Sequence, residues 1–463
     1  MKDGLRKLLV LAMVVGVATC AMLQPLPKPP ANQTIISSGA PLSMVGPDGR
    51  VVLAIRQRVT ARLADLGEDN LLGRHLAAME ASLEAPLVAG NRVRLLVDGP
   101  RAYAAMFGAI AAARDHINVE TYILDEAQYG GTNVSDLLVK KATSGLAVNV
   151  LYDAVGSSET PPEFFAKLKA AGVRICEFNP LNPANRGTMR FTQRDHRKVL
   201  VIDGNRAFAG GINFSATYSS GSRQRRVSAA DVIKGGWRDT HIELEGPAGL
   251  EVQRLFLQSW AKQKCPALKP ASYLPPPSDA GDTLLRINAS SKDSLRNETY
   301  VAALSALTFA KSSIDLTMAY FAPNDHIEAA LIAAARRGVR VRLLLAGVSD
   351  FAGIVHAGRS HYSRLLAAGV QIFEMHKSLL HAKTLEIDGI WSTVGSANWD
   401  SLSFSNNDEL NVIVIDQGFA AQMRAMFADD LATATHIGAV SWAKRPIKQR
   451  ILESFWASWQ RIL

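Results

Sequence analysis

The chain of 463 residues is long enough for two or three domains, and its 48% apolar content can support sizeable cores. Its formal net charge of +9 favours anionic partners, either phospholipid surfaces or nucleic acid. With only three cysteines, the sequence excludes a disulfide framework and a CxxC metal site. We therefore interpret Cys176 and Cys265 as two unrelated buried thiols.

The first thirty residues carry a targeting pattern. A basic start is followed by an apolar run from Leu8 to Leu23 and then by several prolines. This pattern predicts that residues 1–30 are a secretory signal or a membrane anchor, with the body of the protein in the cell envelope, on the periplasmic side of the inner membrane, or secreted. Residues 17–20 match a bacterial lipobox imperfectly, so cleavage, a retained anchor and lipid attachment at Cys20 all remain open.

Beyond this segment the chain divides where its composition changes. Residues 31–90 have a helix-like pattern from Val51 to Glu84 and contain no motif for chemistry. Prolines in residues 266–282 remove strand donors and favour extended chain, which indicates a linker. The predicted units are a helical extension, two domains separated by this linker, and a basic tail: residues 31–90, 91–265, 283–440 and 441–463.

The two predicted domains repeat one another. Residues 170–177 match 367–374, and residues 145–151 match 338–344. Each block is typical of a helix that ends at glycine and leads into a short apolar strand. Alternating strands and helices predict a mostly parallel sheet covered by helices in each half. The sequence thus predicts a duplicated α/β-sandwich fold with pseudo-two-fold symmetry and one site where the halves meet.

The pattern His-x-Lys-x4-Asp occurs once in each half. The two copies are His196, Lys198 and Asp203, and His381, Lys383 and Asp388. Equal offsets from each histidine then lead to a small residue and an asparagine: Gly211 and Asn213 in the first half, Ser396 and Asn398 in the second. Two imidazoles, two ammonium groups and two carboxamides suit a tetrahedral phosphate held between a nucleophile and an acid.

These paired motifs resemble the phospholipase D superfamily. The stretch from His381 to Asn411, the entry to the first domain at 91–99 and the tail from Arg445 are especially similar to bacterial cardiolipin synthases. The resemblance implies a phosphatidyltransferase or phosphodiesterase of phospholipid metabolism. It implies neither a metal ion nor an organic cofactor, because two histidines perform the covalent chemistry.

The resemblance also implies roles for the motif residues. A phosphodiester anion repels nucleophiles and has a poor leaving group, so a nucleophilic imidazole and an acidic imidazole divide the reaction into two displacements. We expect a phosphohistidine on His196, with His381 as general acid and then base, while the reverse assignment stays open. Lys198 and Lys383 are expected to neutralise the phosphate oxygens. Further hydrogen bonds to the phosphate are expected from Gly211, Asn213, Ser396 and Asn398.

Two kinds of carboxylate accompany the histidines. Asp203 and Asp388 complete the motifs and are counted with the catalytic set, although their place at a strand end, and the family pattern, favour a structural role. Asp239 and Glu409 occupy matching places in the repeat and resemble the family position whose carboxylate holds the imidazole. Such a bond fixes the tautomer of the ring. An ordinary strand-end carboxylate is the alternative for each.

Two segments lie outside the repeat. The first half has an insertion between Asn213 and Asp239 whose residues 218–226 are polar and basic, which predicts either a lid over the site or a solvated loop. In the tail, apolar residues recur at steps of four beside a basic face: Ile447, Ile451, Phe455 and Trp459. This pattern is typical of an interfacial membrane helix, and a helix docked on the protein's own core is the alternative.

The preferred hypothesis for function is phosphatidyl transfer between two phosphatidylglycerol molecules, which gives cardiolipin and glycerol. The alternatives are hydrolysis to phosphatidic acid, cleavage of a nucleic-acid phosphodiester, and a lipid-binding protein whose site has decayed. The targeting pattern and the amphipathic tail favour a membrane surface with anionic phospholipid over nucleic acid.

Overall fold

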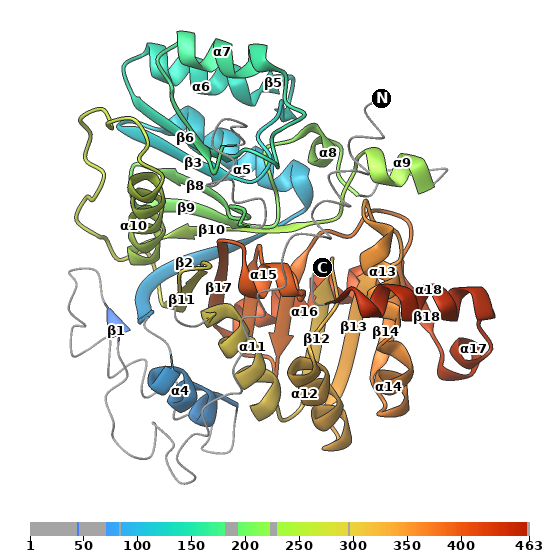
Figure 1. Cartoon of the computed structure of the whole chain (residues 1–463). Helices are drawn as coiled ribbons and strands as arrows, with labels where there is room; N and C mark the ends of the chain where they lie inside the picture. The colour runs from blue at the N-terminus through green and yellow to red at the C-terminus, as the bar shows by residue number, and fades with distance from the viewer. Residues whose placement is uncertain are drawn as a thin grey trace.

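The computed structural model describes residues 44–45, 71–82, 85–180, 193–222, 229–294 and 297–460. One continuous sheet runs through both halves in the order β18-β14-β13-β12-β15-β16-β17-β11-β2-β10-β9-β8-β3-β6-β7. Figure 1 shows how the strands of the two halves meet at β2 and β11. The short β1 (Met44–Val45) pairs with β2 outside this path. The apolar run near the N-terminus and the lipobox lie outside the described residues.

The first half contains seven strands of this sheet and the small hairpin β4–β5. The strands are β2 (Leu87–Val97), β3 (His116–Thr121), β4 (Gln128–Tyr129), β5 (Thr132–Asn133), β6 (Ala147–Asp153), β7 (Arg174–Phe178), β8 (Lys198–Ile202), β9 (Arg206–Gly210) and β10 (Thr240–Glu245). The helices are α5 (Asp98–Ala112), α6 (Val134–Thr143), α7 (Pro162–Ala170), α8 (Ala216–Ser219), α9 (Ala229–Lys234) and α10 (Pro247–Lys262).

The second half repeats this arrangement. Its strands are β11 (Thr283–Ser290), β12 (Ser313–Met318), β13 (Arg340–Ala346), β14 (Gln371–Met375), β15 (Lys383–Ile387), β16 (Trp391–Gly395), β17 (Glu409–Ile415) and β18 (Thr435–Ile437). Its helices are α11 (Glu298–Phe309), α12 (Asp325–Arg336), α13 (Ala352–Arg359), α14 (Tyr362–Ala367), α15 (Ser401–Ser405), α16 (Gln417–Leu431), α17 (Ala439–Ala443) and α18 (Ile447–Ser458). The earlier α4 (Leu71–Ser82) packs on α11. We keep the domain limits 91–265 and 283–440 as a proposal.

The direction of the strands differs from the prediction. Only β3, β6 and β7, and their counterparts β12, β13 and β14, run parallel within the path, and the other neighbours are antiparallel. The prediction of a mostly parallel sheet was therefore wrong. The physical reason lies in the tight turns after each motif strand, at Gly204 (φ +75°) and Gly389 (φ +73°), because turns this short join antiparallel strands.

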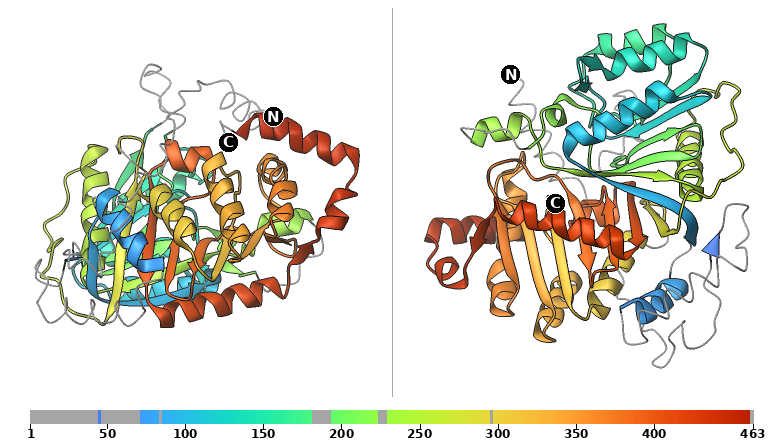
Figure 2. Two further views of the ribbon diagram at one scale, coloured as in Figure 1. Left: turned by 90° about the horizontal axis from the view of Figure 1, so that it is seen from below. Right: turned by 180° about the vertical axis from the view of Figure 1, so that it is seen from behind.

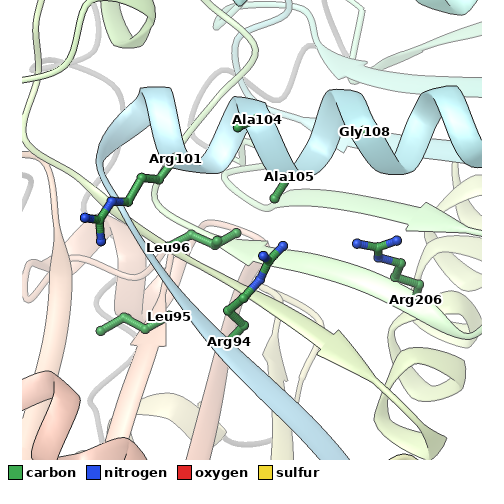
Figure 3. Close-up of a pocket in the computed structure, with 8 residues that line it drawn as sticks. All are labelled: Arg94, Leu95, Leu96, Arg101, Ala104, Ala105, Gly108 and Arg206. Carbon is green, nitrogen blue, oxygen red and sulfur yellow. The ribbon is translucent and has the colours of Figure 1, made fainter.

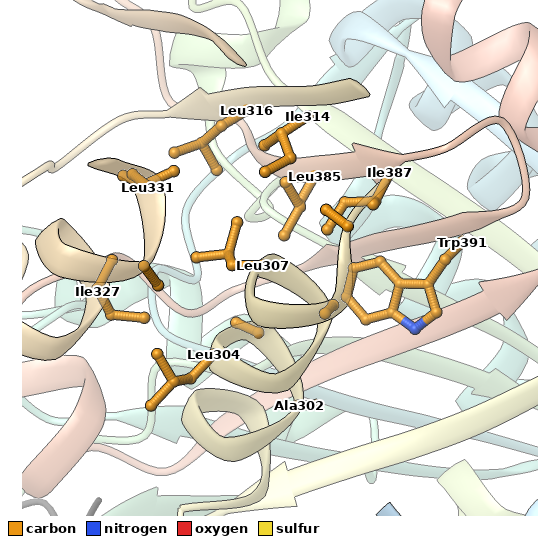
Figure 4. Close-up of a cluster of buried hydrophobic side chains, with 14 of the residues drawn as sticks. Ala302, Leu304, Leu307, Ile314, Leu316, Ile327, Leu331, Leu385, Ile387 and Trp391 are labelled. Atoms are coloured by element: carbon orange, nitrogen blue, oxygen red, sulfur yellow. The ribbon is translucent and has the colours of Figure 1, made fainter. Parts of the chain in front are cut away.

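Helices cover both faces of the sheet. Figure 2 shows α16 on one face of the second half, with α4, α11 and α12 on the other. Side chains of α11, β12, α12, β15 and β16 form the largest buried cluster, part of which is drawn in Figure 4. A second cluster joins the halves, because α10 packs against the central strands β2 and β11 and α16 also packs against β2. The site is thus built on rigid, shared strands.

The two motif aspartates lie at turns. Asp203 accepts hydrogen bonds from the backbone N–H groups of residues 114–116, the shortest at 2.9 Å, and Asp388 accepts from residues 311–313, the shortest at 2.7 Å. A strand rise of about 3.3 Å per residue puts Asp203 roughly 17 Å along the chain from Lys198. The sequence counted both aspartates with the catalytic set, whereas the structure places them at the ends of β8 and β15 opposite the histidines.

The prediction of two unrelated thiols was also wrong, because Cys176 on β7 forms a disulfide with Cys265 after α10. Their Cα atoms lie 5.4 Å apart although 89 residues separate them in the sequence. The pairing depends on α10 packing beside β7, which the spacing of the cysteines does not reveal. The bond sits in a small apolar cluster with Phe256 and Trp260.

The tail forms α18, at the outer edge of the second half in both Figure 1 and Figure 2. One face docks on the protein, where Trp456 packs against Phe351 beside α13. Within the tail, Glu453 is paired with Arg445. The opposite face leaves Ile447, Ile451 and Phe455 more than half exposed. The helix therefore combines features of both alternatives from the sequence: one face is docked on the protein, and the other presents exposed apolar side chains as an interfacial membrane helix would. In the described part of the chain, no helix has the length and apolar character to cross a membrane.

Candidate active site

The two motif loops lie side by side, and each is held by the other half. The backbone N–H of His196 donates to the carbonyl oxygen of Asp408 at 2.9 Å. In the pseudo-symmetric position, the N–H of His381 donates to the carbonyl oxygen of Arg238 at 2.8 Å. Short parallel bridges accompany both contacts. The residues that directly follow these carbonyl groups are Glu409, which starts β17, and Asp239, which directly precedes β10, so each predicted carboxylate lies beside the histidine of the opposite half.

The carboxylates bind the histidines crosswise. Both oxygens of Glu409, in the second half, lie 3.1 Å from Nδ1 of His196, in the first. Asp239 Oδ2, in the first half, lies 2.7 Å from Nδ1 of His381, in the second. All four side chains are buried or nearly so, and the rings of His196 and His381 keep only 11% and 7% exposure. Because these contacts cross the interface, each histidine–carboxylate pair needs residues from both halves.

Burial sets the protonation of these pairs. It lowers the pKa of His196 to about 4, although Glu409 opposes the shift. Burial alone would raise the pKa of Glu409, but the neighbouring His196 and Lys198 lower it to about 2. A neutral ring thus donates from Nδ1 to an ionised carboxylate, and Nε2 is left unprotonated. Asp239 likewise has a lowered pKa, because His381 and Lys383 outweigh its burial.

The motif lysines point into the same region. Lys198 Nζ donates to the backbone oxygen of His196 at 2.6 Å and lies 5.2 Å from the centre of the Tyr122 ring. Lys383 Nζ donates to the backbone oxygen of His381. Burial, which disfavours the charged form, lowers the pKa of Lys198 to about 7 and that of Lys383 to about 8. Two lysine side chains that lose their protons more easily than usual thus lie beside two imidazoles, and when they are protonated this group of side chains can bind an anion.

Three of the four predicted phosphate ligands have other partners. A Cβ on Gly211 would lie 2.0 Å from Asp239 Oδ1, so this glycine provides room for the carboxylate. Ser396 Oγ, at the equivalent place, donates to Glu409 Oε2 at 2.5 Å. Asn213 Oδ1 accepts from the backbone N–H of Ile123 at 3.0 Å.

Asn398 differs from its counterpart in the first half. It is buried, and its Oδ1 has no hydrogen-bond partner within the described ranges. Its side chain is therefore the one of the four whose polar atoms are not already committed to the protein.

Aromatic residues that the sequence did not single out surround the histidines. Tyr122 packs edge-on against His196 at 5.1 Å, and Trp237 and Tyr320 lie 5.2 and 6.4 Å from His381, measured between ring centres. The hydroxyl oxygen of Tyr218 lies 3.2 Å from His381 Nδ1. Tyr218 was predicted only as the start of a lid, yet it is fully buried. The signal that reveals it is its offset of five residues from Asn213.

The arginines of the predicted lid, at 223, 225 and 226, lie outside the described residues. A hollow of about 510 Å³ lies elsewhere on the first half, between α5 and the strands beneath it, and Figure 3 shows its lining: Arg94, Leu95, Leu96, Arg101, Ala104, Ala105, Gly108 and Arg206. Glu243 accepts hydrogen bonds from Arg94 and Arg206, at 2.6 and 2.5 Å. These two arginines are thus paired with Glu243, and no motif residue is among the residues that line the hollow, so this hollow is not part of the histidine site.

Among the described residues, no three or more His, Cys, Asp or Glu side chains are grouped so as to hold a metal ion. The residues that meet at the interface are instead two neutral imidazoles, two lysines and two ionised carboxylates. This set can accept a phosphodiester anion and attack its phosphorus with the bare nitrogen of one neutral ring. The second ring, once it has taken up a proton, can deliver that proton to the departing oxygen.

Comparison with known proteins identifies the family. The family model described as "Cardiolipin synthase, PLD-like domain" matches residues 106–225 and 303–431, one region in each half. Cardiolipin synthase 2 of Bacillus cereus is 33% identical over 367 residues, which are 79% of this chain and 69% of that one. Cardiolipin synthase A of Pseudomonas aeruginosa is 35% identical over 361 residues, 77% of this chain and 70% of that one.

A solved structure supports the fold. Phosphatidylserine synthase of Haemophilus influenzae aligns with a TM-score of 0.59 at 12% identity, covering 82% of this chain and 98% of that one. Two matched regions, relatives above 30% identity over most of both chains and the paired histidine motifs agree. The chain therefore belongs to the phospholipase D superfamily, in the family of the PLD-like domain of cardiolipin synthases, and is an enzyme.

Proposed function

We propose that this enzyme transfers a phosphatidyl group from one phosphatidylglycerol to another, forming cardiolipin and releasing glycerol. The observation that carries the proposal is the pair of buried histidines, each bonded through Nδ1 to a carboxylate of the opposite half. The relatives named cardiolipin synthase, at 33–35% identity, support the choice of substrate.

In the first displacement, His196 is the nucleophile. Its unprotonated Nε2 forms a bond to phosphorus while the bond to the glycerol oxygen breaks. His381 gives its Nε2 proton to that oxygen, so glycerol departs as a neutral alcohol. The negative charge of the bound phosphodiester favours the protonated form of His381, against the effect of burial.

In the second displacement, a hydroxyl of another phosphatidylglycerol attacks the phosphatidyl-histidine. His381 now takes the proton of that hydroxyl, and the bond between phosphorus and His196 breaks. We expect Lys198, Lys383 and the side-chain NH2 of Asn398 to stabilise the phosphate oxygens in both steps, and each such donor is worth about 10²–10³ in rate. The low exposure of both rings favours an alcohol acceptor over water.

We also propose that the enzyme works at a membrane surface outside the cytoplasm. Exposed Ile447, Ile451 and Phe455 on α18, flanked by Lys448 and Arg450, suit an anionic phospholipid surface. The disulfide suits an oxidising compartment such as the periplasm. The apolar N-terminal run supports the same location.

Product analysis with labelled phosphatidylglycerol vesicles tests the proposed reaction. Cardiolipin and glycerol should form in equal amounts. Phosphatidic acid alone, with abundant acceptor present, would make the enzyme a phospholipase D hydrolase. Faster cleavage of DNA than of lipid would replace the lipid substrate altogether.

The pH dependence of kcat/KM should follow Lys198. On a soluble nitrophenyl phosphodiester, whose leaving group needs no proton from His381, we expect kcat/KM to fall as the pH rises through about 7, because Lys198 then loses its proton. On the acid side, His196 stays neutral and nucleophilic down to about pH 4. Lys198→Arg, which keeps its charge, should move the alkaline limb to higher pH. A rate that keeps rising to pH 9 in the unchanged enzyme would contradict this assignment.

Loss of the Asp203 carboxylate should affect stability rather than chemistry. We expect Asp203→Ala to lower the free energy of unfolding by about 1–3 kcal/mol, because three backbone N–H groups lose their acceptor. Urea unfolding measures this change, and kcat per folded molecule should stay close to that of the unchanged enzyme. A hundredfold loss of kcat with normal stability would return Asp203 to the catalytic set.

A further inference from the structure

At one position beside the histidines, the two halves of the repeat carry different residues. Tyr218 lies five residues after Asn213, and Ser403 lies five residues after Asn398, so the two residues are equivalent in the repeat. Ser403 Oγ accepts a hydrogen bond from the backbone N–H of Asn398 at 3.2 Å. The longer Tyr218 side chain instead brings its hydroxyl oxygen to 3.2 Å from Nδ1 of His381.

Tyr218 is held firmly in this position. Its side chain is fully buried, and its oxygen accepts a hydrogen bond from Asn213 Nδ2 at 3.2 Å. Its ring packs edge-on against Trp237 at 5.5 Å between ring centres. The Tyr103 hydroxyl donates to the backbone oxygen of Ser215 at 2.8 Å and so fixes the turn that carries Tyr218. The ring cannot swing away without breaking these contacts.

The two histidines therefore have different surroundings. Nδ1 of His381 faces two oxygens, Asp239 Oδ2 at 2.7 Å and Tyr218 Oη at 3.2 Å. Among the residues that the structure describes, Nδ1 of His196 faces only the two oxygens of Glu409, both at the longer distance of 3.1 Å.

The charged groups that act on the His381 ring are Asp239, Lys383 and Lys198. The two lysines oppose a positive charge on this ring, whereas Asp239 favours one. A further oxygen acceptor at Nδ1 adds to the effect of Asp239, because acceptors stabilise the charged form of a donor.

We propose, on the basis of the two-histidine mechanism above, that Tyr218 is a positioning residue that commits His381, and not His196, to the role of general acid. Tyr218 touches neither the phosphate nor the alcohol. It holds the ring orientation and favours the imidazolium whose Nε2 proton goes to the departing glycerol oxygen. The Ser403 side chain bonds instead to the backbone of Asn398 and to the Asp400 carboxylate. His196 therefore receives no such support from it and stays a nucleophile.

Tyr218→Phe removes the oxygen and keeps the ring. For phosphatidylglycerol we expect the first displacement to slow about tenfold or more, a loss typical of one hydrogen bond to a charged group. A phosphatidyl diester of nitrophenol, whose leaving group departs without a proton, should release nitrophenol in the first turnover at close to the normal rate. The ratio of the two rates, measured on one preparation, does not depend on how much of the variant is folded.

The alkaline limb of the phosphatidylglycerol rate should also move to lower pH in this variant, because His381 then loses its proton more readily. Tyr320→Phe is the matched control. Tyr320 also packs edge-on against His381, but its hydroxyl donates to Asp350 at 2.6 Å. This control should leave the ratio of the two rates unchanged.

Equal slowing of both substrates in Tyr218→Phe, or no slowing of either, would overturn the positioning role. His381→Ala separates this failure from a failure of the mechanism. If His381→Ala slows the glycerol leaving group far more than nitrophenol while Tyr218→Phe does not, only the role of Tyr218 is wrong. If His381→Ala slows the glycerol and nitrophenol leaving groups equally, the assignment of His381 as the general acid is itself wrong.

Discussion

Alanine at either motif histidine is expected to stop steady-state turnover. Loss of His196 removes the nucleophile. In a serine protease, removal of a nucleophile that works together with a neighbouring base costs about 10⁶ in kcat. Loss of His381 removes the acid and base, which should cost about 10²–10⁴. Cardiolipin formation from phosphatidylglycerol vesicles measures both effects.

The double variant and a distant histidine provide the controls. Because the two rings act in one sequence of steps, His196→Ala with His381→Ala together should be no slower than His196→Ala alone. His326 is exposed on α12, outside the site, and His326→Ala should keep full activity. Near-normal turnover in either motif variant would refute the paired-histidine scheme.

Amides in place of the crossing carboxylates should be nearly as damaging. Glu409→Gln and Asp239→Asn keep the shape of the site but present an amide to Nδ1, which permits the wrong tautomer of each ring. In a serine protease triad, the equivalent change costs about 10⁴ in kcat. We expect losses of 10²–10⁴ here, with KM little changed, in steady-state assays on vesicles.

A carboxylate–histidine pair outside the site serves as the control for these variants. Glu328 Oε2 lies 2.9 Å from Nδ1 of His361, in the second half, and also binds Arg364. Glu328→Gln should lower stability and leave kcat per folded molecule unchanged. If Glu328→Gln reduced kcat as much as Glu409→Gln does, the loss of kcat in Glu409→Gln could not be assigned to the missing carboxylate at the site.

Much of the site was predictable because the chemistry repeats in the sequence. Equal offsets after His196 and His381 identified the halves, the lysines and the asparagines. The orienting positions, Asp239 and Glu409, came from their matching places in the repeat and from the family resemblance. The crossing of these carboxylates was not predictable, because a repeat fixes equivalence within each half and says nothing of which half supplies a partner. Packing of β10 and β17 against the opposite motif loop decides that.

The errors have a common physical origin. The Cys176–Cys265 disulfide, the antiparallel strands and the buried Tyr218 all depend on contacts between segments far apart in the chain. Gly204 and Gly389, which directly follow the motif aspartates, were the local signals of the antiparallel turns. Composition made residues 218–226 look like one polar segment, either a lid or a solvated loop, although its first residue is buried.

The most direct test of the mechanism is to find which residue carries the covalent intermediate. His381→Ala, mixed with the nitrophenyl phosphatidyl donor, should form the intermediate and then lose it slowly, because no base activates the acceptor. Acid quenching is unsuitable for a phosphohistidine, so the protein should be quenched in base, digested and mapped by mass spectrometry. We predict a phosphatidyl group on His196 and on no other residue. An adduct on another residue, or turnover with no covalent adduct at any time, would contradict the proposed mechanism.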